Sequence, residues 1–231
     1  GALLEPGTSL AEAGLVDGTQ LTVVHTSPSL RIVTASYDET AKLWDAESGE
    51  CTLTLEGHDS AVMSAMFSPD GTRVLTVASD CTFRIWDAKT GECTLAVECH
   101  GFFVWSAVFS PDGTLILTTS FDGTIRLWDA FTGQRQRSIH GHSGSVNSAD
   151  FSPDGTRLLT ASSDRTARLW DAASGESLRT LVHLSSSVNS AAFSPDGAQV
   201  ATACEDSFAR LWDAASGELT CTLIGHSEAV S

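Results

Sequence analysis

The chain has 231 residues, of which 42% are hydrophobic and 18% are charged, so it can bury the core of one large domain or two small ones. Its 13 Lys and Arg against 29 Asp and Glu give a net charge of −16, the wrong sign for binding a phosphate backbone, and we expect no nucleic-acid partner. No apolar run approaches the roughly 20 residues that span a bilayer, so no direct membrane insertion is expected.

The cysteines indicate reduced thiols rather than disulfides or a metal site. There are six, well below the density of a disulfide scaffold, and no two of them form a Cys-x-x-Cys motif. Cys99 and His100 are adjacent, and neighbouring residues rarely chelate one ion, so we expect no metal. Reduced thiols are typical of a reducing intracellular compartment, and we expect a cytoplasmic protein.

Residues 1–20 form a leader that does not repeat elsewhere in the chain. Leu3-Leu4-Glu5-Pro6-Gly7 and Asp17-Gly18-Thr19-Gln20 resemble the closing segment of a ubiquitin-like domain. The alternative is a leader whose Leu and Val residues pack on the first repeat. The two interpretations assign Leu21 to Val24 to different sheets.

From residue 21 the sequence follows a repeat of 42 residues. A tryptophan marks each copy, with Asp directly after it, Asp six residues before it and Thr ten residues before it. The five tryptophans are Trp44, Trp86, Trp128, Trp170 and Trp212. Four copies of Ser-Pro-Asp-Gly, starting at Ser68, Ser110, Ser152 and Ser194, predict tight turns.

Each repeat contains four short apolar runs bounded by turns, which predicts four strands and no long helix. Because such a small sheet cannot bury both of its faces alone, neighbouring sheets must stack face to face, and a circular stack is an all-β propeller. The predicted blades are residues 21–56, 61–98, 103–140, 145–182 and 187–224. Leu21 to Thr26 aligns without a gap onto the first strand of later blades, with Leu21 over Met63, and Gly225 to Ser231 predicts the first strand of a sixth blade.

The Gly-His, Ser-Pro-Asp-Gly, Thr-x-x-x-Asp and Leu-Trp-Asp elements resemble the WD-repeat family of β-propellers, over about residues 21–231. Propellers of this family commonly close with seven blades. The resemblance therefore implies that the five blades belong to a larger ring, which is completed by a longer chain or within a larger complex.

The resemblance also implies a buried hydrogen-bonded chain in each blade, made by His, Thr, Asp and Trp. The three complete sets are His58, Thr76, Asp80 and Trp86; His100, Thr118, Asp122 and Trp128; and His142, Thr160, Asp164 and Trp170. Ser-His-Asp chemistry is the alternative, but an active site in every repeat is implausible, so we expect no catalytic residues. In the fifth blade, His183 stands at the Gly position and Leu184 at the His position, so Asp206 should lack an imidazole; Val16 takes the His position in the first.

Aromatic residues in the variable loops are candidates for a partner site. They are Phe102, Phe103, Trp105 and Phe121 in the third blade and Tyr37 in the first. Large rigid side chains on a propeller rim are typical of a protein-binding hot spot. The alternative is that Phe103 and Trp105 fill the gap between the second and third blades.

Three functional hypotheses follow. The first is a non-enzymatic scaffold that binds a protein or peptide on the propeller rim, without a cofactor. The second is a sensor or regulatory module of a longer signalling protein. The third, a small-molecule binder or enzyme that uses the central channel, is disfavoured because the channel mouth carries no acid, base or nucleophile.

Overall fold

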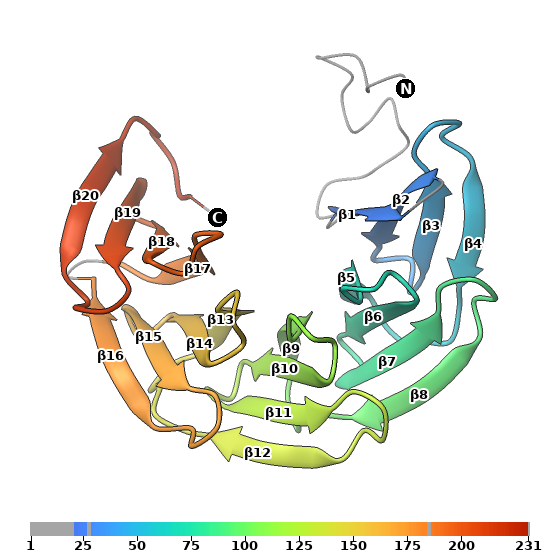
Figure 1. Cartoon of the computed structure of the whole chain (residues 1–231), viewed down its shortest axis with the longest axis horizontal. Helices are drawn as coiled ribbons and strands as arrows, with labels where there is room; N and C mark the ends of the chain where they lie inside the picture. The colour runs from blue at the N-terminus through green and yellow to red at the C-terminus, as the bar shows by residue number, and fades with distance from the viewer. Residues whose placement is uncertain (1–20, 27–28, 184–185, 231) are drawn as a thin grey trace. The chain divides into compact units, whose positions relative to one another are not determined.

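The computed structural model describes residues 21–26, 29–183 and 186–230, and all the regular structure in them is β-strand. The strands form four-stranded antiparallel sheets in which neighbours in sequence are neighbours in the sheet (Figure 1). The predicted all-β class and the four strands per repeat are therefore confirmed. The leader at residues 1–20, with its ubiquitin-like resemblance, lies outside the described residues.

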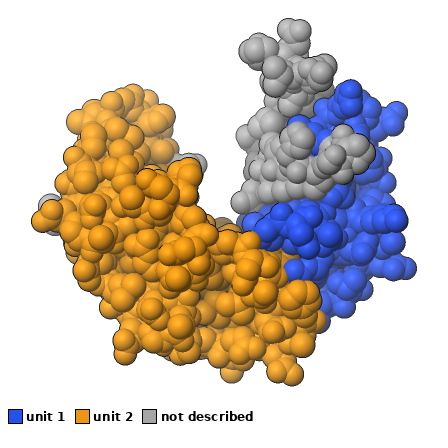
Figure 2. Space-filling view, in the orientation of Figure 1, with its two compact units in different colours: residues 1–100 blue, residues 101–231 orange. Residues whose placement is uncertain are grey.

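The chain divides into two compact units, residues 1–100 and 101–231 (Figure 2). The first unit holds two sheets. Their strands are β1 (Leu21–Thr26), β2 (Ser29–Ala35), β3 (Ala41–Asp45) and β4 (Cys51–Leu55), then β5 (Val62–Phe67), β6 (Arg73–Ala78), β7 (Thr82–Asp87) and β8 (Cys93–Glu98).

The second unit holds three sheets. Their strands are β9 (Val104–Phe109), β10 (Leu115–Ser120), β11 (Ile125–Asp129) and β12 (Arg135–Ile139); β13 (Val146–Phe151), β14 (Arg157–Ser162), β15 (Thr166–Asp171) and β16 (Ser177–Val182); and β17 (Val188–Phe193), β18 (Gln199–Cys204), β19 (Phe208–Asp213) and β20 (Leu219–Ile224).

The Ser-Pro-Asp-Gly turns close the first hairpin of a sheet through their own side chains. In the third sheet, Asp112 Oδ1 accepts hydrogen bonds from Ser110 Oγ at 2.6 Å and from the Thr114 backbone N–H at 3.0 Å. The Ser110 hydroxyl oxygen also accepts the Leu115 N–H at 2.9 Å. Gly113 has a φ of 69°, a left-handed conformation that glycine adopts without strain. The turn is therefore fixed locally by its sequence.

Within each unit the sheets stack through apolar faces, as the repeat predicts. In the second unit, Leu117, Leu127 and Ile139 of the third sheet join Leu158 and Trp170 of the fourth in one buried cluster. A second cluster joins the fourth sheet to the fifth, and a third joins the two sheets of the first unit. The closed ring and its number of blades stay predictions.

Strand β1 exists as predicted, but the gapless alignment gives the wrong register for its pairing with β2. Leu21 pairs with Thr34, whereas in the second sheet it is Ala65 that pairs with the equivalent Thr76, so β1 is displaced by two residues. The cause is the missing Ser-Pro-Asp-Gly turn, because β1 ends at Thr26 and β2 already begins at Ser29. Leu21 to Val24 thus pair with β2 in the first sheet.

The predicted first strand of a sixth blade is absent from the described residues, in which no strand follows β20. Val230 nevertheless donates its N–H to Cys204 O at 2.9 Å, as Val62 at the equivalent position donates to Ser36 O at 3.0 Å. Val230 therefore makes the contact that precedes a first strand without forming a strand itself.

Candidate functional site

The structure brings the four predicted residues of the second sheet together in one chain. His58 Nδ1 lies 2.9 Å from Asp80 Oδ2, and His58 Nε2 lies 2.7 Å from Thr76 Oγ1. Thr76 Oγ1 also accepts the Trp86 indole N–H at 2.8 Å. The imidazole, hydroxyl and indole are all buried, so each polar atom has its partner inside the protein.

The fourth sheet repeats this geometry. His142 Nδ1 lies 2.8 Å from Asp164 Oδ2, His142 Nε2 lies 2.7 Å from Thr160 Oγ1, and Trp170 donates to the same hydroxyl oxygen at 2.9 Å. Burial lowers the pKa of His142, although Asp164 opposes the shift, so the ring is neutral at pH 7. A neutral ring carries one proton, which Nδ1 donates to the carboxylate while Nε2 accepts from Thr160.

The carboxylates in these two chains are ionised. Burial alone raises the pKa of Asp164, but hydrogen bonds from Thr166 and His142 outweigh it, and the pKa lies below its ordinary value. The pKa of Asp80 is lowered in the same way, with Thr82 and His58 as donors that outweigh burial. Because the hydroxyls of Thr76 and Thr160 are fully buried and already accept an indole N–H, each set ties the loop before its sheet to the strands and exposes no hydroxyl nucleophile.

The third predicted set falls at the boundary between the two compact units. His100 ends the first unit, whereas Thr118, Asp122 and Trp128 belong to the second. Trp128 donates its indole N–H to Thr118 Oγ1 at 2.9 Å, and both residues are buried. Asp122 is exposed, against the expectation of burial, and its Oδ1 caps the turn by accepting the Thr124 N–H at 2.8 Å.

In the first sheet the pair of Thr34 and Trp44 is present, with the indole N–H 2.9 Å from the hydroxyl oxygen. Asp38 is exposed, and of the residues that the structure describes only those of its own turn donate to it, including the Thr40 N–H at 3.1 Å. The residues at the His position in the first and fifth repeats, Val16 and Leu184, lie outside the described residues.

The fifth sheet contains an imidazole that the sequence pattern did not predict there. His183 is buried, its ring lies 5.1 Å from that of Trp212 in an edge-on arrangement, and its Nδ1 lies 3.2 Å from Cys204 Sγ. Asp206 is paired instead with Arg210, whose Nη2 donates to Oδ2 at 2.7 Å. Asp206 thus uses a donor other than an imidazole, as expected, whereas the expectation that Trp212 lacks an imidazole is wrong because the His183 ring packs on it.

Four of the five predicted partner residues form one exposed group, which we call the aromatic surface: Phe102, Phe103, Trp105 and Phe121. Their exposed fractions are 58%, 56%, 41% and 54%. Phe103 O accepts the backbone N–H of Phe121 at 3.0 Å and the hydroxyl of Ser120 at 3.0 Å, so the loop before β9 and the turn after β10 lie side by side. Val104, between Phe103 and Trp105, is buried, whereas both of its neighbours are exposed, and the pairing of β9 with β10 shifts register at Trp105.

Tyr37, the fifth candidate, is exposed in the first compact unit, whereas the aromatic surface belongs to the second. The alternative role of Phe103 and Trp105 as filler concerns the boundary between the units and stays open. Phe131 is exposed too but was not singled out, because its turn between β11 and β12 matches the regular repeat pattern. It stands where the other repeats carry Glu47, Lys89, Ala173 or Ala215.

The sequence pattern also missed Asp150, a partly buried carboxylate in β13. Its Oδ2 accepts the Phe193 backbone N–H from β17 at 3.0 Å, and burial raises its pKa despite that bond. No group of three or more His, Cys, Asp or Glu side chains in the described part of the chain is placed to hold a metal ion. In that same part, no helix has the length and apolar character needed to cross a membrane.

Stacked four-stranded sheets in a 42-residue register, each with a Thr–Trp bond, define a repeat protein of the propeller class. The family model "WD domain, G-beta repeat" matches residues 49–87, 91–129, 133–171 and 175–213, more than half of the chain. The chain therefore belongs to the WD-repeat family.

Individual curated proteins match over about one repeat. The chain is 51% identical over 43 residues to the human F-box-like/WD repeat-containing protein TBL1Y, which is 19% of this chain and 8% of the relative. It is 49% identical over 45 residues to the nuclear distribution protein PAC1 of Cryptococcus neoformans, 20% of this chain and 10% of the relative. It is 46% identical over 43 residues to ribosome assembly protein 4 of Chaetomium thermophilum, 19% of this chain and 8% of the relative. The matches thus span a tenth or less of these relatives.

Proposed function

We propose that this protein is a non-enzymatic scaffold and that the aromatic surface of its third sheet binds a protein or peptide. Membership in the WD-repeat family supports the general role of a protein-interaction scaffold. The observation that carries the specific site is the exposure of four large aromatic side chains on adjoining loops of one sheet. The interaction would lie on the rim of the propeller, at the ends of β9 and β10.

The chemistry of this surface favours a partner with apolar side chains on a basic background. Exposed aromatic rings bury a large area with few rotatable bonds, which is why they dominate the binding energy of many interfaces. The equivalent loops of other repeats, Asp59-Ser60-Ala61 and Ser143-Gly144-Ser145, are small or polar, so the repeat itself does not require the aromatic residues. The net charge of −16 would attract a cationic partner from a distance.

The relatives support this class of role and nothing narrower. Their names refer to an F-box-like protein, to nuclear distribution and to ribosome assembly, and only the last of these names an assembly process. Since each matched stretch is a single repeat, the matches support a shared fold with a general binding role, and they do not indicate a shared partner.

Replacing Phe102 and Phe121 together with Ser tests the site. We expect partner binding to weaken by about 2 kcal/mol or more, the scale at which buried aromatic anchors act, while the circular dichroism spectrum stays unchanged. The measurement is quantitative capture of partners from the source cell by the wild-type and variant chains.

Phe131→Ser is the matched control, because it removes an equally exposed aromatic ring at the opposite end of the same sheet. A partner that is lost with the double variant but retained with the control supports the aromatic surface. Equal recovery by all three chains would exclude it, and unfolding of the double variant would favour the role of core filler.

The scaffold would act in a reducing compartment and within a larger assembly. All six cysteines are unpaired in the structure, and Cys51, Cys93 and Cys221 are exposed, which fits a compartment that keeps thiols reduced. In the fifth sheet Leu223 is 48% exposed, whereas the equivalent Leu181 of the fourth sheet is 1% exposed because the fifth sheet covers it. Gel filtration of a cytosolic fraction checks both points, and elution at the mass of the protein's own single chain, read from a denaturing gel of the same fraction, would contradict the assembly.

A further inference from the structure

An arginine at the start of the second strand bridges neighbouring sheets within each of the two compact units. Arg31 Nη2 donates to Gly71 O at 2.6 Å and its Nη1 to Ala88 O at 3.1 Å, and its guanidinium lies 5.1 Å from the ring centroid of Phe67. Each acceptor belongs to the next sheet along the chain. The guanidinium thus fills the space beside the glycine of a Ser-Pro-Asp-Gly turn.

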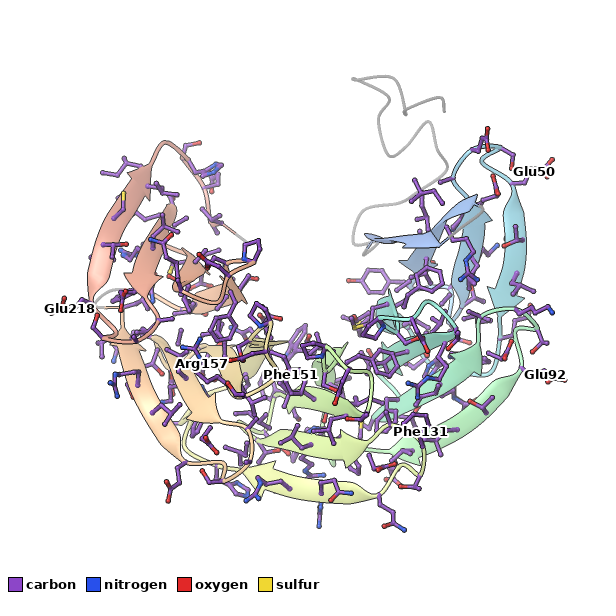
Figure 3. All side chains as sticks on the ribbon, viewed as in Figure 1. Glu50, Glu92, Phe131, Phe151, Arg157 and Glu218 are labelled. Carbon is purple, nitrogen blue, oxygen red and sulfur yellow. The ribbon has the colours of Figure 1, made fainter. Side chains whose placement is uncertain are left out.

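Arg157 repeats the arrangement in the second unit (Figure 3). Its Nη2 donates to Gly197 O at 2.8 Å, its Nη1 to Ala214 O at 3.5 Å, and its guanidinium lies 5.2 Å from the ring centroid of Phe193. Arg31 and Arg157, which are 126 residues apart, therefore make the same contacts: hydrogen bonds to two carbonyl oxygens and a cation–π contact with one phenylalanine ring.

Between the third and fourth sheets this arginine is replaced by Leu115, which has no donor. The equivalent carbonyl oxygens, Gly155 O and Ala172 O, accept no hydrogen bond from any described residue. Phe151, labelled in Figure 3, occupies the position of Phe193 and belongs to the cluster on which Leu115 packs. The acceptors for a guanidinium are thus present, but the chain supplies no guanidinium.

A pocket of about 370 Å³ lies at this position, and its lining includes Pro111, Asp112, Leu115, Pro153, Asp154 and Gly155. A Cβ placed on Gly155 would have only Pro111 within 4 Å, at 3.7 Å, whereas one placed on Gly197 would lie 3.4 Å from Arg157 Nη2. The space that arginine fills in the next pair of sheets is therefore open here.

The pocket is negatively charged at its rim. Hydrogen bonds from Ser152 and Thr156 lower the pKa of Asp154 to about 2, and those from Ser110 and Thr114 lower the pKa of Asp112. Both residues are exposed, and both carboxylates are ionised at neutral pH. A lining of Leu115 and two prolines, with two carboxylates at the rim and the unused carbonyl of Gly155, suits a cation that is flat and weakly hydrated.

We propose that this pocket binds the side chain of an arginine from a partner protein, which takes the place that Arg31 and Arg157 fill within the chain. A guanidinium has five donors in one plane, so it can reach two carbonyls and a carboxylate together, whereas an ammonium is compact and strongly hydrated. The inference goes beyond the proposed function and is independent of it. The pocket lies at the far end of β9 from Phe103, about 20 Å away for a strand of six residues.

The test uses N-acetylarginine N-methylamide as the probe and the isosteric, neutral N-acetylcitrulline N-methylamide as its control. With the chain labelled at leucine methyl groups and backbone amides, we expect saturable NMR shifts at Leu115 and Gly155 on addition of the arginine compound. Binding of the citrulline compound should be at least about tenfold weaker, because it lacks the charge that Asp112 and Asp154 attract.

Two variants separate this pocket from other acidic surfaces. Leu115→Arg should fill the pocket from within, as Arg157 does in the next pair of sheets, and abolish the shift at Gly155 while the fold is retained. The second, Asp112→Asn with Asp154→Asn, keeps an oxygen acceptor for each turn but removes both charges, and should weaken binding several-fold.

The outcomes decide the proposal in either direction. Shifts at Leu115 and Gly155 that favour arginine over citrulline and vanish in the filled variant support it. An absence of shifts at both residues, or equal binding of the two compounds, overturns it. If Leu115→Arg does not fold, undiminished binding by the double Asn variant overturns it equally.

Discussion

Replacing Asp164 with Ala removes the carboxylate on which the buried chain of the fourth sheet ends. Its Oδ2 accepts from His142 Nδ1 at 2.8 Å and from the Ser143 N–H at 3.1 Å, and its Oδ1 accepts from the Thr166 N–H at 3.0 Å and hydroxyl at 2.6 Å. The side chain of Asp164 is 5% exposed and that of His142 is not exposed. The substitution therefore leaves the buried imidazole N–H with only a longer contact, to Thr166 Oγ1 at 3.3 Å.

The loss of stability depends on which of the former donors to Asp164 can form hydrogen bonds with water instead. The Ser143 and Thr166 donors lie towards the surface and recover much of their hydrogen bonding from solvent. The buried imidazole cannot reach water and keeps only the 3.3 Å contact to Thr166 Oγ1. A poorly satisfied buried donor costs about 1–3 kcal/mol, and the hydrogen bond that is lost was to a charged acceptor, which makes the loss larger. We expect the free energy of unfolding to fall by about 3 kcal/mol, which for a chain of this size lowers the melting temperature by about 6–12 °C.

Asp38→Ala is the matched control. Asp38 occupies the same position in the first sheet, but among the described residues its carboxylate accepts hydrogen bonds only from the N–H and hydroxyl of Thr40 in its own exposed turn. Its removal should cost about 1 kcal/mol or less, because water replaces each of the lost partners.

The assay is thermal and urea unfolding followed by circular dichroism and tryptophan fluorescence. A double-mutant cycle with His142→Ala isolates the coupling between imidazole and carboxylate, since both single variants lose the same bond. If Asp38→Ala and Asp164→Ala destabilise the protein equally, or if His142 and Asp164 show no coupling energy, the buried chain does not stabilise the sheet.

Two further predictions concern titratable groups inside the second unit. Burial, together with the charge of Arg210, lowers the pKa of His183 to about 4, whereas in the unfolded chain it is near 6.5. Because the folded pKa is the lower one, stability is lost as the pH falls from 6.5 towards 4, by about 2 kcal/mol at pH 5, and His183→Asn should flatten this slope in urea unfolding measured from pH 7 to 5. The pKa of Asp150 is raised, so its ionised form destabilises the fold at neutral pH. Asp150→Asn, which keeps an acceptor for the Phe193 N–H, should raise the melting temperature at pH 7 by a few degrees, and a lower melting temperature would contradict this reasoning.

The sheets could be predicted from sequence because local chemistry fixes them. The turn at Ser110 to Leu115 is closed by its own Ser and Asp side chains, and the Trp128 indole finds its acceptor ten residues away in the adjoining strand. Interactions of this short range repeat whenever the residues repeat. The register of β1 was mispredicted where that local turn is missing, which shows that the turn, and not the apolar pattern, sets the register.

The side-chain network of the fifth sheet could not be predicted, because its partners come from several loops and strands and differ from those of the other sheets. His183 stands one position before the usual His, and a gapless reading assigns it to the Gly position. In the structure it packs on Trp212 and bonds to Cys204, a residue that the repeat does not otherwise use. Arg210 then replaces the imidazole as the partner of Asp206. The Asp at this position of the repeat therefore accepts from His in one sheet and from Arg in another, and the sequence motif alone does not tell which donor is used.

The residues that vary between repeats are mainly those that connect one sheet to the next. Within sheets, the Thr–Trp bond recurs in all five, from Thr34 to Thr202, because it depends only on neighbouring strands. Between sheets, the position of Arg31, Arg73 and Arg157 is occupied by Leu115 in the third repeat and by Gln199 in the fifth. A change at such a position leaves the sheet intact but opens the seam between two sheets to an outside ligand. The repeat therefore keeps its fold while its seams and loops diverge, and binding specificity in this chain should be sought at those seams and loops.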